Sequence, residues 1–124
     1  KAASPFNWRA PQNDNLWQGV NGVNNPCPAG YRLPTATELN AEVTEYNITN
    51  STTAFASPLK FTVPGYRNGS SGALTNVGSN GYYWTSSVSV TVPANAARRY
   101  FSSVATGADS GYRASGMSVR CLKD

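Results

Sequence analysis

The sequence predicts a single loop-rich domain, residues 1–124, in which short strands accompany one helix. Gly, Ser, Thr, Asn and aromatic residues are abundant and charged residues make up only 13% of the chain, a mixture that suits turns and short strands better than a helical bundle. A helix-start signal follows Cys27, and the second cysteine, Cys121, lies almost at the far end. We therefore expect a domain with a real core, closed by a clasp between residues 25–39 and 116–124.

The first 26 residues form an irregular, aromatic segment. Phe6, Trp8 and Trp17 stand among Asn, Gln and Gly residues, and turn signals recur through residues 17–23. The first interpretation is that both tryptophans are core anchors that pack a terminal strand or hairpin. The alternative is a surface platform on which sugar rings stack.

The most secure helix is expected at about residues 35–46. Thr35 and Glu38 match a capping box, which satisfies free N–H groups at a helix start, and apolar residues then recur at helical spacing. Carboxylates early in a helix are favoured by its dipole, so we interpret them as structural. Residues 47–57 are expected to form either a short second helix or an open loop.

Strands are expected in the second half of the chain. Apolar and polar residues alternate over 59–63, which indicates a half-buried strand stopped by the following Pro-Gly pair. Residues 82–87 are expected to be the central strand, and residues 117–122, which include Cys121, the last one. Between these two, residues 88–115 loosen into small and polar residues.

The two cysteines predict one disulfide and an oxidising location, because no third thiol competes for the pairing. The alternative is two buried free thiols in a cytosolic protein. The sequence shows no signal peptide, transmembrane span or lipidation site. Because the chain opens abruptly at Lys1, we expect it to be the C-terminal part of a longer surface or phage protein.

Composition excludes several function classes. The chain has no histidine, which removes Ser/His catalysis in its usual form, and two cysteines cannot fill a structural zinc shell. Its six acidic residues offer little for paired-carboxylate hydrolysis. The net charge of +4 comes from scattered arginines, so nucleic-acid binding is not expected. We predict no catalytic residue, metal ligand or cofactor, although a structural calcium ion on backbone carbonyls is compatible with the sequence.

Three ordered motifs together resemble a known family. They are CPAGYRLPT at 27–35 followed by Glu38, GYYWTSS at 81–87, and Arg113 followed by GMSVRC at 116–121. Over roughly residues 25–124 the chain resembles the Fibrobacter succinogenes major paralogous domain, a bacterial and phage family with the C-type lectin-like fold.

The resemblance implies an α+β domain with small antiparallel sheets, whose termini lie close together. It also implies a disulfide that runs from just before the first helix to the last strand, where Cys27 and Cys121 are placed. An N-terminal strand that pairs with the last strand would suit this fold. The loops between the central strands would then form the ligand face.

Some members of this family are the variable proteins of diversity-generating retroelements. In these, adenine-directed mutagenesis randomises codons in a segment that ends just before the closing strand, which here corresponds to residues 88–115. That segment contains no Lys, Glu, Gln, Met or Trp, the residues that a randomised Asn codon cannot encode. The alternative is an ordinary polar loop of a relative that does not diversify.

The segment 88–115 also has the composition of a paratope, because tyrosine supplies contact area at low entropic cost and small residues leave room for a partner. Arg113 has an alternative role as a brace of the loop, and we assign Tyr82, Trp84, Phe101 and Arg120 to the scaffold. The residues that we predict to contact ligand are Val88, Val90, Thr91, Asn95, Arg98, Arg99, Tyr100, Ser102, Thr106, Asp109, Ser110, Tyr112 and Arg113.

The resulting hypothesis is a non-enzymatic recognition domain on a bacterial surface or phage tail that binds a protein or glycan receptor on a target cell. We expect no direct membrane insertion and no nucleic-acid partner, and self-association through the parent protein is compatible with the hypothesis. The alternative is a structural or assembly module whose loops pack against sister domains of a fibre or virion.

Two further readings rank below these. Calcium-dependent sugar binding is disfavoured because the chain lacks the Glu-Pro-Asn, Gln-Pro-Asp and Trp-Asn-Asp motifs of the lectins that use calcium. The formylglycine-generating enzymes share the lectin-like fold, but the cysteines of this chain look structural, so we predict no enzymatic activity.

Overall fold

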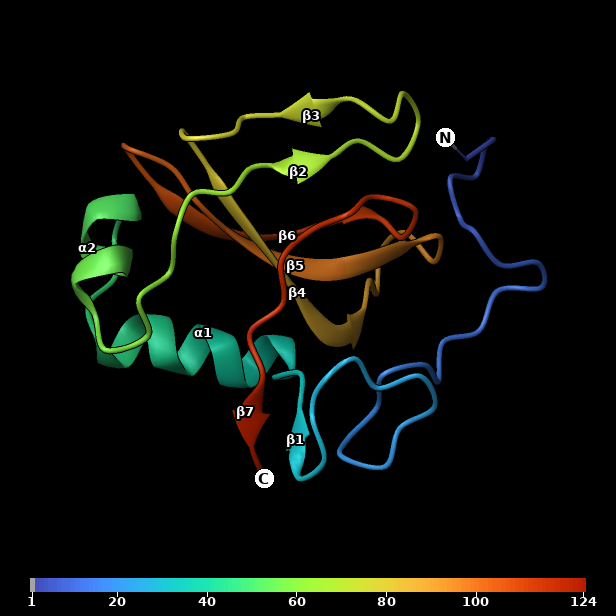
Figure 1. The fold of residues 1–124 in the computed structure, drawn as a ribbon, viewed down its shortest axis with the longest axis horizontal. Coiled ribbons are helices and arrows are strands. Elements are labelled where there is room, and N and C mark those ends of the chain that lie inside the picture. The colour runs from blue at the N-terminus through green and yellow to red at the C-terminus, as the bar shows by residue number, and fades with distance from the viewer. Residues whose placement is uncertain (1) are drawn as a thin grey trace.

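The computed structural model describes residues 2–124 and has an α+β fold with two helices and three small antiparallel sheets (Figure 1). This confirms the predicted fold class. Within residues 2–124 neither helix has the length and apolar character that a membrane crossing requires. The elements in chain order are β1 (Tyr31–Arg32), α1 (Ala36–Glu45), α2 (Ser51–Ala56), β2 (Tyr66–Arg67), β3 (Leu74–Thr75), β4 (Gly81–Val88), β5 (Asn95–Phe101), β6 (Thr106–Tyr112) and β7 (Leu122–Lys123).

Both helices begin with a capping box. The Thr35 hydroxyl accepts a hydrogen bond from the Glu38 backbone N–H at 3.2 Å, and the Glu38 carboxylate accepts one from the Thr35 backbone N–H at 2.8 Å. The predicted first helix is therefore confirmed. Asn50 and Thr53 repeat the arrangement at the start of α2, so residues 47–57 contain a short helix and are not an open loop.

The core lies between α1 and the sheet of β4, β5 and β6. Leu39 and Val43 of α1 share one buried cluster with Tyr83 and Phe101 of the sheet. Phe61 completes this cluster, with its ring centroid 4.9 Å from that of Phe101. Burial of these large apolar side chains is the main source of stability for the domain.

Strand β5 is the centre of the three-stranded sheet, whose order is β4-β5-β6. The prediction that residues 82–87 form the central strand is therefore wrong, since β4 lies at one edge. The chain that leads into β7 covers this edge. There the Trp84 N–H donates to the Ser118 carbonyl at 3.0 Å, and the Ser118 N–H donates to the Tyr82 carbonyl at 3.1 Å.

The segment 88–115 is more regular than predicted, because most of it forms the β5–β6 hairpin. The two strands pair without a break from Asn95 opposite Tyr112 to Phe101 opposite Thr106. Small residues are a packing requirement here: a Cβ atom at Gly107 would lie 2.6 Å from the Tyr100 ring. Gly107, one of the small residues that suggested an open loop, therefore leaves room for the Tyr100 ring on the sheet.

Residues 59–63 bury alternate side chains as predicted, but they do not form a strand. Phe61 is 2% exposed, whereas Lys60 adopts a left-handed backbone with φ of 50°. The Thr62 N–H donates to the Tyr83 hydroxyl at 2.9 Å and the Phe61 N–H to the Ala54 carbonyl at 3.2 Å. Because these donors are taken by a side chain and by a helix end, no strand partner forms a ladder with the segment.

The N-terminal segment is also irregular: residues 2–30 contain no strand, so the predicted terminal strand or hairpin is wrong. The segment, blue in Figure 1, runs along one side of the molecule. The side chain of Trp8 is 65% exposed and that of Trp17 is half-buried. The interpretation of these tryptophans as core anchors is therefore wrong, because the core is filled from α1, α2, residue Phe61 and the sheet.

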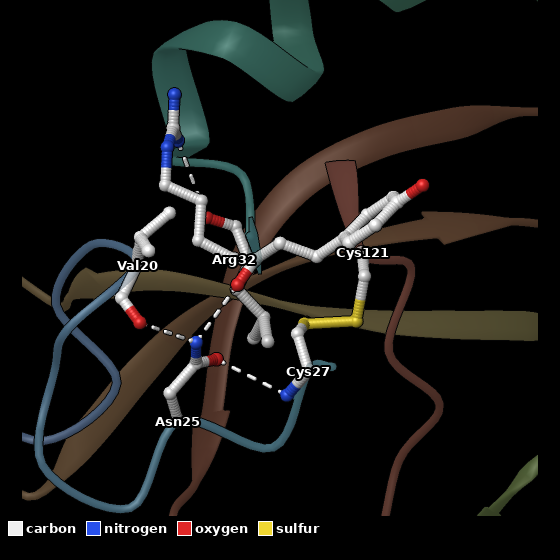
Figure 2. The surroundings of a disulfide bond; sticks show 7 residues. Val20, Asn25, Cys27, Arg32 and Cys121 are labelled. Carbon is white, nitrogen blue, oxygen red and sulfur yellow. Dashed lines mark hydrogen bonds between the residues drawn. A yellow bond between two sulfur atoms is a disulfide. The ribbon is translucent and has the colours of Figure 1, made fainter. Parts of the chain in front are cut away.

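The clasp between the two cysteine segments is present. Cys27 and Cys121 form a disulfide with a Cα–Cα distance of 5.8 Å, and Asn25 holds the first cysteine segment through hydrogen bonds to Val20 and Cys27 (Figure 2). Just beyond the cysteines, β1 pairs with β7. The disulfide rules out the alternative of two free thiols and is consistent with a location outside the cytoplasm.

Arg32 extends the clasp to the start of α1. Its guanidinium donates to both carboxylate oxygens of Glu38, at 2.8 and 2.7 Å, and to the Asp124 carboxylate at 2.7 Å. The hydrogen bonds from Arg32, and after them the one from the Thr35 backbone N–H, lower the pKa of Glu38 to about 2. One side chain therefore links the helix cap, β1 and the C-terminus, and the Glu38 carboxylate has the structural role that was expected of it.

Candidate ligand-binding site

The residues predicted to contact ligand do not converge on one site. They occupy both faces and both ends of the β5–β6 hairpin. The most exposed of them, Val90 at 95%, lies with Thr91 in the loop 89–94 between β4 and β5. Ser102 lies at the other end of the hairpin, where it closes the 102–105 turn through hydrogen bonds with Ala105.

On one face of the hairpin, Arg98 is held by an ion pair and by an aromatic ring. Arg98 donates to both carboxylate oxygens of Asp109, at 2.7 and 3.0 Å, and lies 4.8 Å from the ring centroid of Tyr82. Tyr100 lies next to Tyr82, with a centroid distance of 6.4 Å. Arg98 and Tyr100 are only partly exposed, whereas Asp109 is exposed. The side chains on this face therefore pack mainly against one another.

The opposite face is used to hold α1. Arg99 donates to the Asn40 side chain at 2.9 Å and to the Thr106 hydroxyl at 3.1 Å, and its burial lowers the pKa of the guanidinium. Asn95 donates to the Ser110 hydroxyl at 3.2 Å. These four predicted ligand contacts therefore make structural hydrogen bonds to each other and to the helix.

Arg113 lies in the position of a brace. Its guanidinium donates to the carbonyls of Asn95, Asn13 and Pro93 at 3.3, 3.2 and 2.9 Å, and pairs with Asp14 at 2.6 Å. Hydrogen bonds from Gln12 and Arg113 hold the pKa of Asp14 below its ordinary value. Through these contacts Arg113 connects the N-terminal segment to the loop 89–94. Its side chain is only 14% exposed.

A cleft opens beside this brace, between the N-terminal segment and β4. Its volume is about 210 Å³, and its walls include Trp8, Trp17 and Trp84. Val88 and Arg113 are the predicted ligand contacts that line it. Tyr112 lies outside the cleft and packs on Phe6, with ring centroids 4.7 Å apart.

Trp8 and Trp17 line the cleft, whereas the sequence favoured a role for them as core anchors. Trp84 is 4% exposed, as its scaffold assignment predicted, and it also lines the cleft. Trp8 and Trp17 stand in a segment without periodicity, so no pattern tells which side of the ring is covered. The available signal was the association of tryptophan with Asn, Gln and Arg neighbours, which are polar groups that line ligand sites.

The carboxylates do not gather into a metal site. Four of the six acidic residues are each paired with an arginine: Glu38, Asp124, Asp109 and Asp14. Among residues 2–124 no three His, Cys, Asp or Glu side chains lie close enough to hold a metal ion together. The chemistry that the arrangement supports is therefore stacking on tryptophan and hydrogen bonding at the cleft rim.

Comparison of the chain with family models, with curated proteins and with solved structures found no match.

Proposed function

We propose that the chain is a non-enzymatic recognition domain that binds a protein or glycan receptor through the end of the molecule that carries the loop 89–94 and the tryptophan cleft. The observation that supports this most directly is the contrast in exposure. The clasp closes one part of the chain with a disulfide, whereas the loop presents Val90 at 95% exposure beside a cleft of about 210 Å³. A concave surface lined by aromatic side chains with a few polar groups is typical of binding sites.

The domain belongs, in this proposal, to the family that its three motifs resemble, and it adopts a C-type lectin-like fold on a bacterial surface or phage particle. The disulfide supports an extracellular location, since such bonds persist in oxidising surroundings. The ion-paired carboxylates and the absence of histidine support a role in binding without catalysis.

Diversification of residues 88–115 is part of the same proposal. Within this segment the buried residues are Phe101, Gly111, Ala114 and Ser115. Of the remaining positions, those in the loop 89–94 carry exposed side chains such as Val90 and Val92, so the scaffold can accept many side chains there without loss of its core. Gly107 and Arg113 are instead fixed by packing and by hydrogen bonds. A template repeat with adenine-directed variation near the gene would support this part of the proposal.

A binding array with paired surface variants tests the proposal. The intact domain is applied to an array of bacterial surface proteins and glycans, in calcium and in chelator. One variant carries Val90→Glu and Thr91→Arg in the loop 89–94. A matched control carries Leu74→Glu and Val77→Arg, at side chains that are 64% and 60% exposed elsewhere on the surface.

We expect a ligand whose binding survives chelator, is lost in the loop variant and is kept in the control. Thermal unfolding should show that both variants are folded. Binding that survives in the loop variant contradicts the proposed face. Concentration-dependent self-association that only the loop variant abolishes, without any array ligand, assigns the face to contacts between copies, as the assembly alternative requires.

A further inference from the structure

The chain has three tryptophans, and all of them line the cleft beside Arg113. Trp8 and Trp17 come from the N-terminal segment, whereas Trp84 comes from β4. Tryptophan is the largest apolar side chain and is usually used to fill a core. Trp84 is 4% exposed and belongs to the buried scaffold, but Trp8 and Trp17 lie outside the core, so the position of these two at the cleft requires another explanation.

The two N-terminal tryptophans are held in place, and Trp8 is accessible. Trp8 donates its indole N–H to the Ala114 carbonyl at 3.0 Å, which fixes one edge while 65% of the residue is exposed. Trp17 has φ of 64°, a left-handed conformation that bulky residues rarely adopt. The backbone N–H of Trp17 donates to the Val23 carbonyl, and the side chain of Gln18 donates to the Ser86 carbonyl. The neighbouring structure thus maintains a costly conformation at the cleft wall.

The size of the cleft limits the ligand to one ring. Its volume of about 210 Å³ exceeds the roughly 150 Å³ that accommodates benzene in an engineered cavity, and lies below the ~300 Å³ at which drug-sized pockets begin. The cleft is open to solvent on one side, so the ring can be part of a longer molecule.

The charges at the cleft favour an acidic ligand. Arg9 lines the cleft, and within residues 2–124 its guanidinium has no carboxylate partner. The Asp14 carboxylate also lines it, but Arg113 neutralises that charge at 2.6 Å. One positive charge therefore remains unbalanced. A cationic ligand is disfavoured by the two arginines, although aromatic walls alone would suit one.

Asn7 and Asn13 also line the cleft, and their side-chain oxygens accept hydrogen bonds from the backbone N–H groups of Arg9 and Asn15. This leaves the amide N–H groups of the two asparagines as the donors that a polar ligand would use. A sugar ring has one face of C–H groups that packs on an indole and an edge of hydroxyls that bonds amides. A carboxylate on such a ring is matched by the planar fork of an arginine.

We propose that the tryptophan cleft binds one sugar ring that carries a carboxylate, with its C–H face on Trp8 and its acid group at Arg9. The inference rests on the proposed recognition function, because it names a ligand class for one part of the same face. The ring is the terminal or exposed acidic sugar of a larger glycan. Its binding needs no calcium.

Tryptophan fluorescence provides a specific readout, because all three tryptophans lie in the cleft. The intact oxidised chain is titrated with methyl glucuronide and methyl galacturonide, and separately with methyl glucoside, in chelator. We expect both acidic sugars to change the fluorescence and the neutral one to bind about tenfold more weakly. Salt at about 1 M should remove most of this difference, because it screens the exposed charge pair.

Three variants test the assigned residues. Trp8→Ala should abolish binding of all three sugars, and Trp8→Phe should retain part of it, since a smaller aromatic face remains. Arg9→Gln should reduce the acidic sugars to the level of methyl glucoside. Arg67→Gln, at an exposed arginine outside the cleft, is the matched control and should bind as the unaltered chain does.

The outcomes separate this inference from the proposed function. If neither acidic sugar binds at tens of millimolar, or if Trp8→Ala binds them unchanged while folded, the acidic-sugar site is overturned. The array result for Val90→Glu with Thr91→Arg then still decides the recognition function. If the acidic sugars bind but no array ligand depends on the loop 89–94, the acidic-sugar site in the cleft is supported. The proposal that the loop forms the recognition face is then contradicted.

Discussion

Two regions of this domain are each organised around an arginine, but they are built differently. At the clasp, Arg32 joins Glu38 to Asp124, where a disulfide and the β1–β7 pair already fix the chain. At the tryptophan cleft, Arg113 joins Asp14 to the loop 89–94, and residues 2–26 contain neither a cysteine nor a strand that could add to this link. The two side chains are similarly shielded, at 18% and 14% exposure.

The difference shows how the domain can combine a stable frame with an adaptable surface. The clasp has a disulfide and a pair of backbone strands besides Arg32, so the arginine adds to covalent and backbone links. At the cleft, side-chain hydrogen bonds are the main connection between the N-terminal segment and the sheet end. Regions with few backbone hydrogen bonds open at lower free energy than the rest of a domain. Ligand-binding segments are commonly drawn from such regions.

The largest expected effect concerns the disulfide. The bond spans 94 residues, so its removal by Cys27→Ser with Cys121→Ser should lower the free energy of unfolding by about 4 kcal/mol. Denaturant unfolding of the variant and of the reduced chain should give similar losses. A loss below about 1 kcal/mol would show that the clasp holds without its covalent bond.

The second effect separates the two arginines. Arg113→Gln should lower the free energy of unfolding by about 1–3 kcal/mol, because its carbonyl and carboxylate partners lose a charged donor. Hydrogen exchange should increase mainly in residues 7–17 and 89–95, and binding of methyl glucuronide should weaken. Arg32→Gln is the matched control: it should cost a similar free energy but leave exchange and binding at the cleft unchanged.

The third effect is acid sensitivity at the clasp. The pKa of Glu38 is lowered to about 2 from 4.5, so the stabilisation is complete above pH 4.5 and is lost as the pH falls toward 2. Because the Glu38 side chain is 40% exposed, we expect about 1–2 kcal/mol after allowance for solvent screening. Unfolding measured from pH 5 to pH 2 should show this loss, and Glu38→Gln should remove it. An unchanged pH profile in the variant would contradict the assignment.

The smallest effect is at the cap of α1. Thr35→Ala removes the hydroxyl that accepts from the Glu38 N–H, and should lower the free energy of unfolding by about 1 kcal/mol. Thr35→Ser keeps the hydroxyl and should restore most of this stability. Neither variant should alter sugar binding, since Thr35 does not line the cleft. Weakened binding would indicate that the two regions are coupled.

The same two regions differ in how much of them the sequence predicted. The capping box and the cysteine pair at the clasp are local or unique signals, and both were confirmed. Phe61 was predicted to be buried, but its strand was wrong, because hydrogen-bond partners of a backbone are decided by tertiary packing. The hairpin at 95–112 was missed, because Ala and Gly have low strand propensity and are favoured here by the close approach of Tyr100 to Gly107.

For the ligand site the sequence favoured the segment 88–115, of whose predicted contacts Val88 and Arg113 line the cleft, and it placed the N-terminal tryptophans in the core. A tryptophan in an aperiodic segment carries no signal for what covers it. Trp8 donates to the Ala114 carbonyl, and Gln18, which follows Trp17, donates to the Ser86 carbonyl. Both partners lie far along the chain, so these contacts could not be predicted from the local sequence. Arg113, for which two roles were open, has the contacts of a brace.

The most direct test of the central claim is the array comparison between the loop variant, Val90→Glu with Thr91→Arg, and its control, Leu74→Glu with Val77→Arg. If the loop 89–94 and the adjoining cleft form the recognition face, the intact domain and the control bind the same ligand in chelator, and the folded loop variant does not. Equal binding by all three proteins would contradict the claim, and the receptor would then have to be bound by another surface.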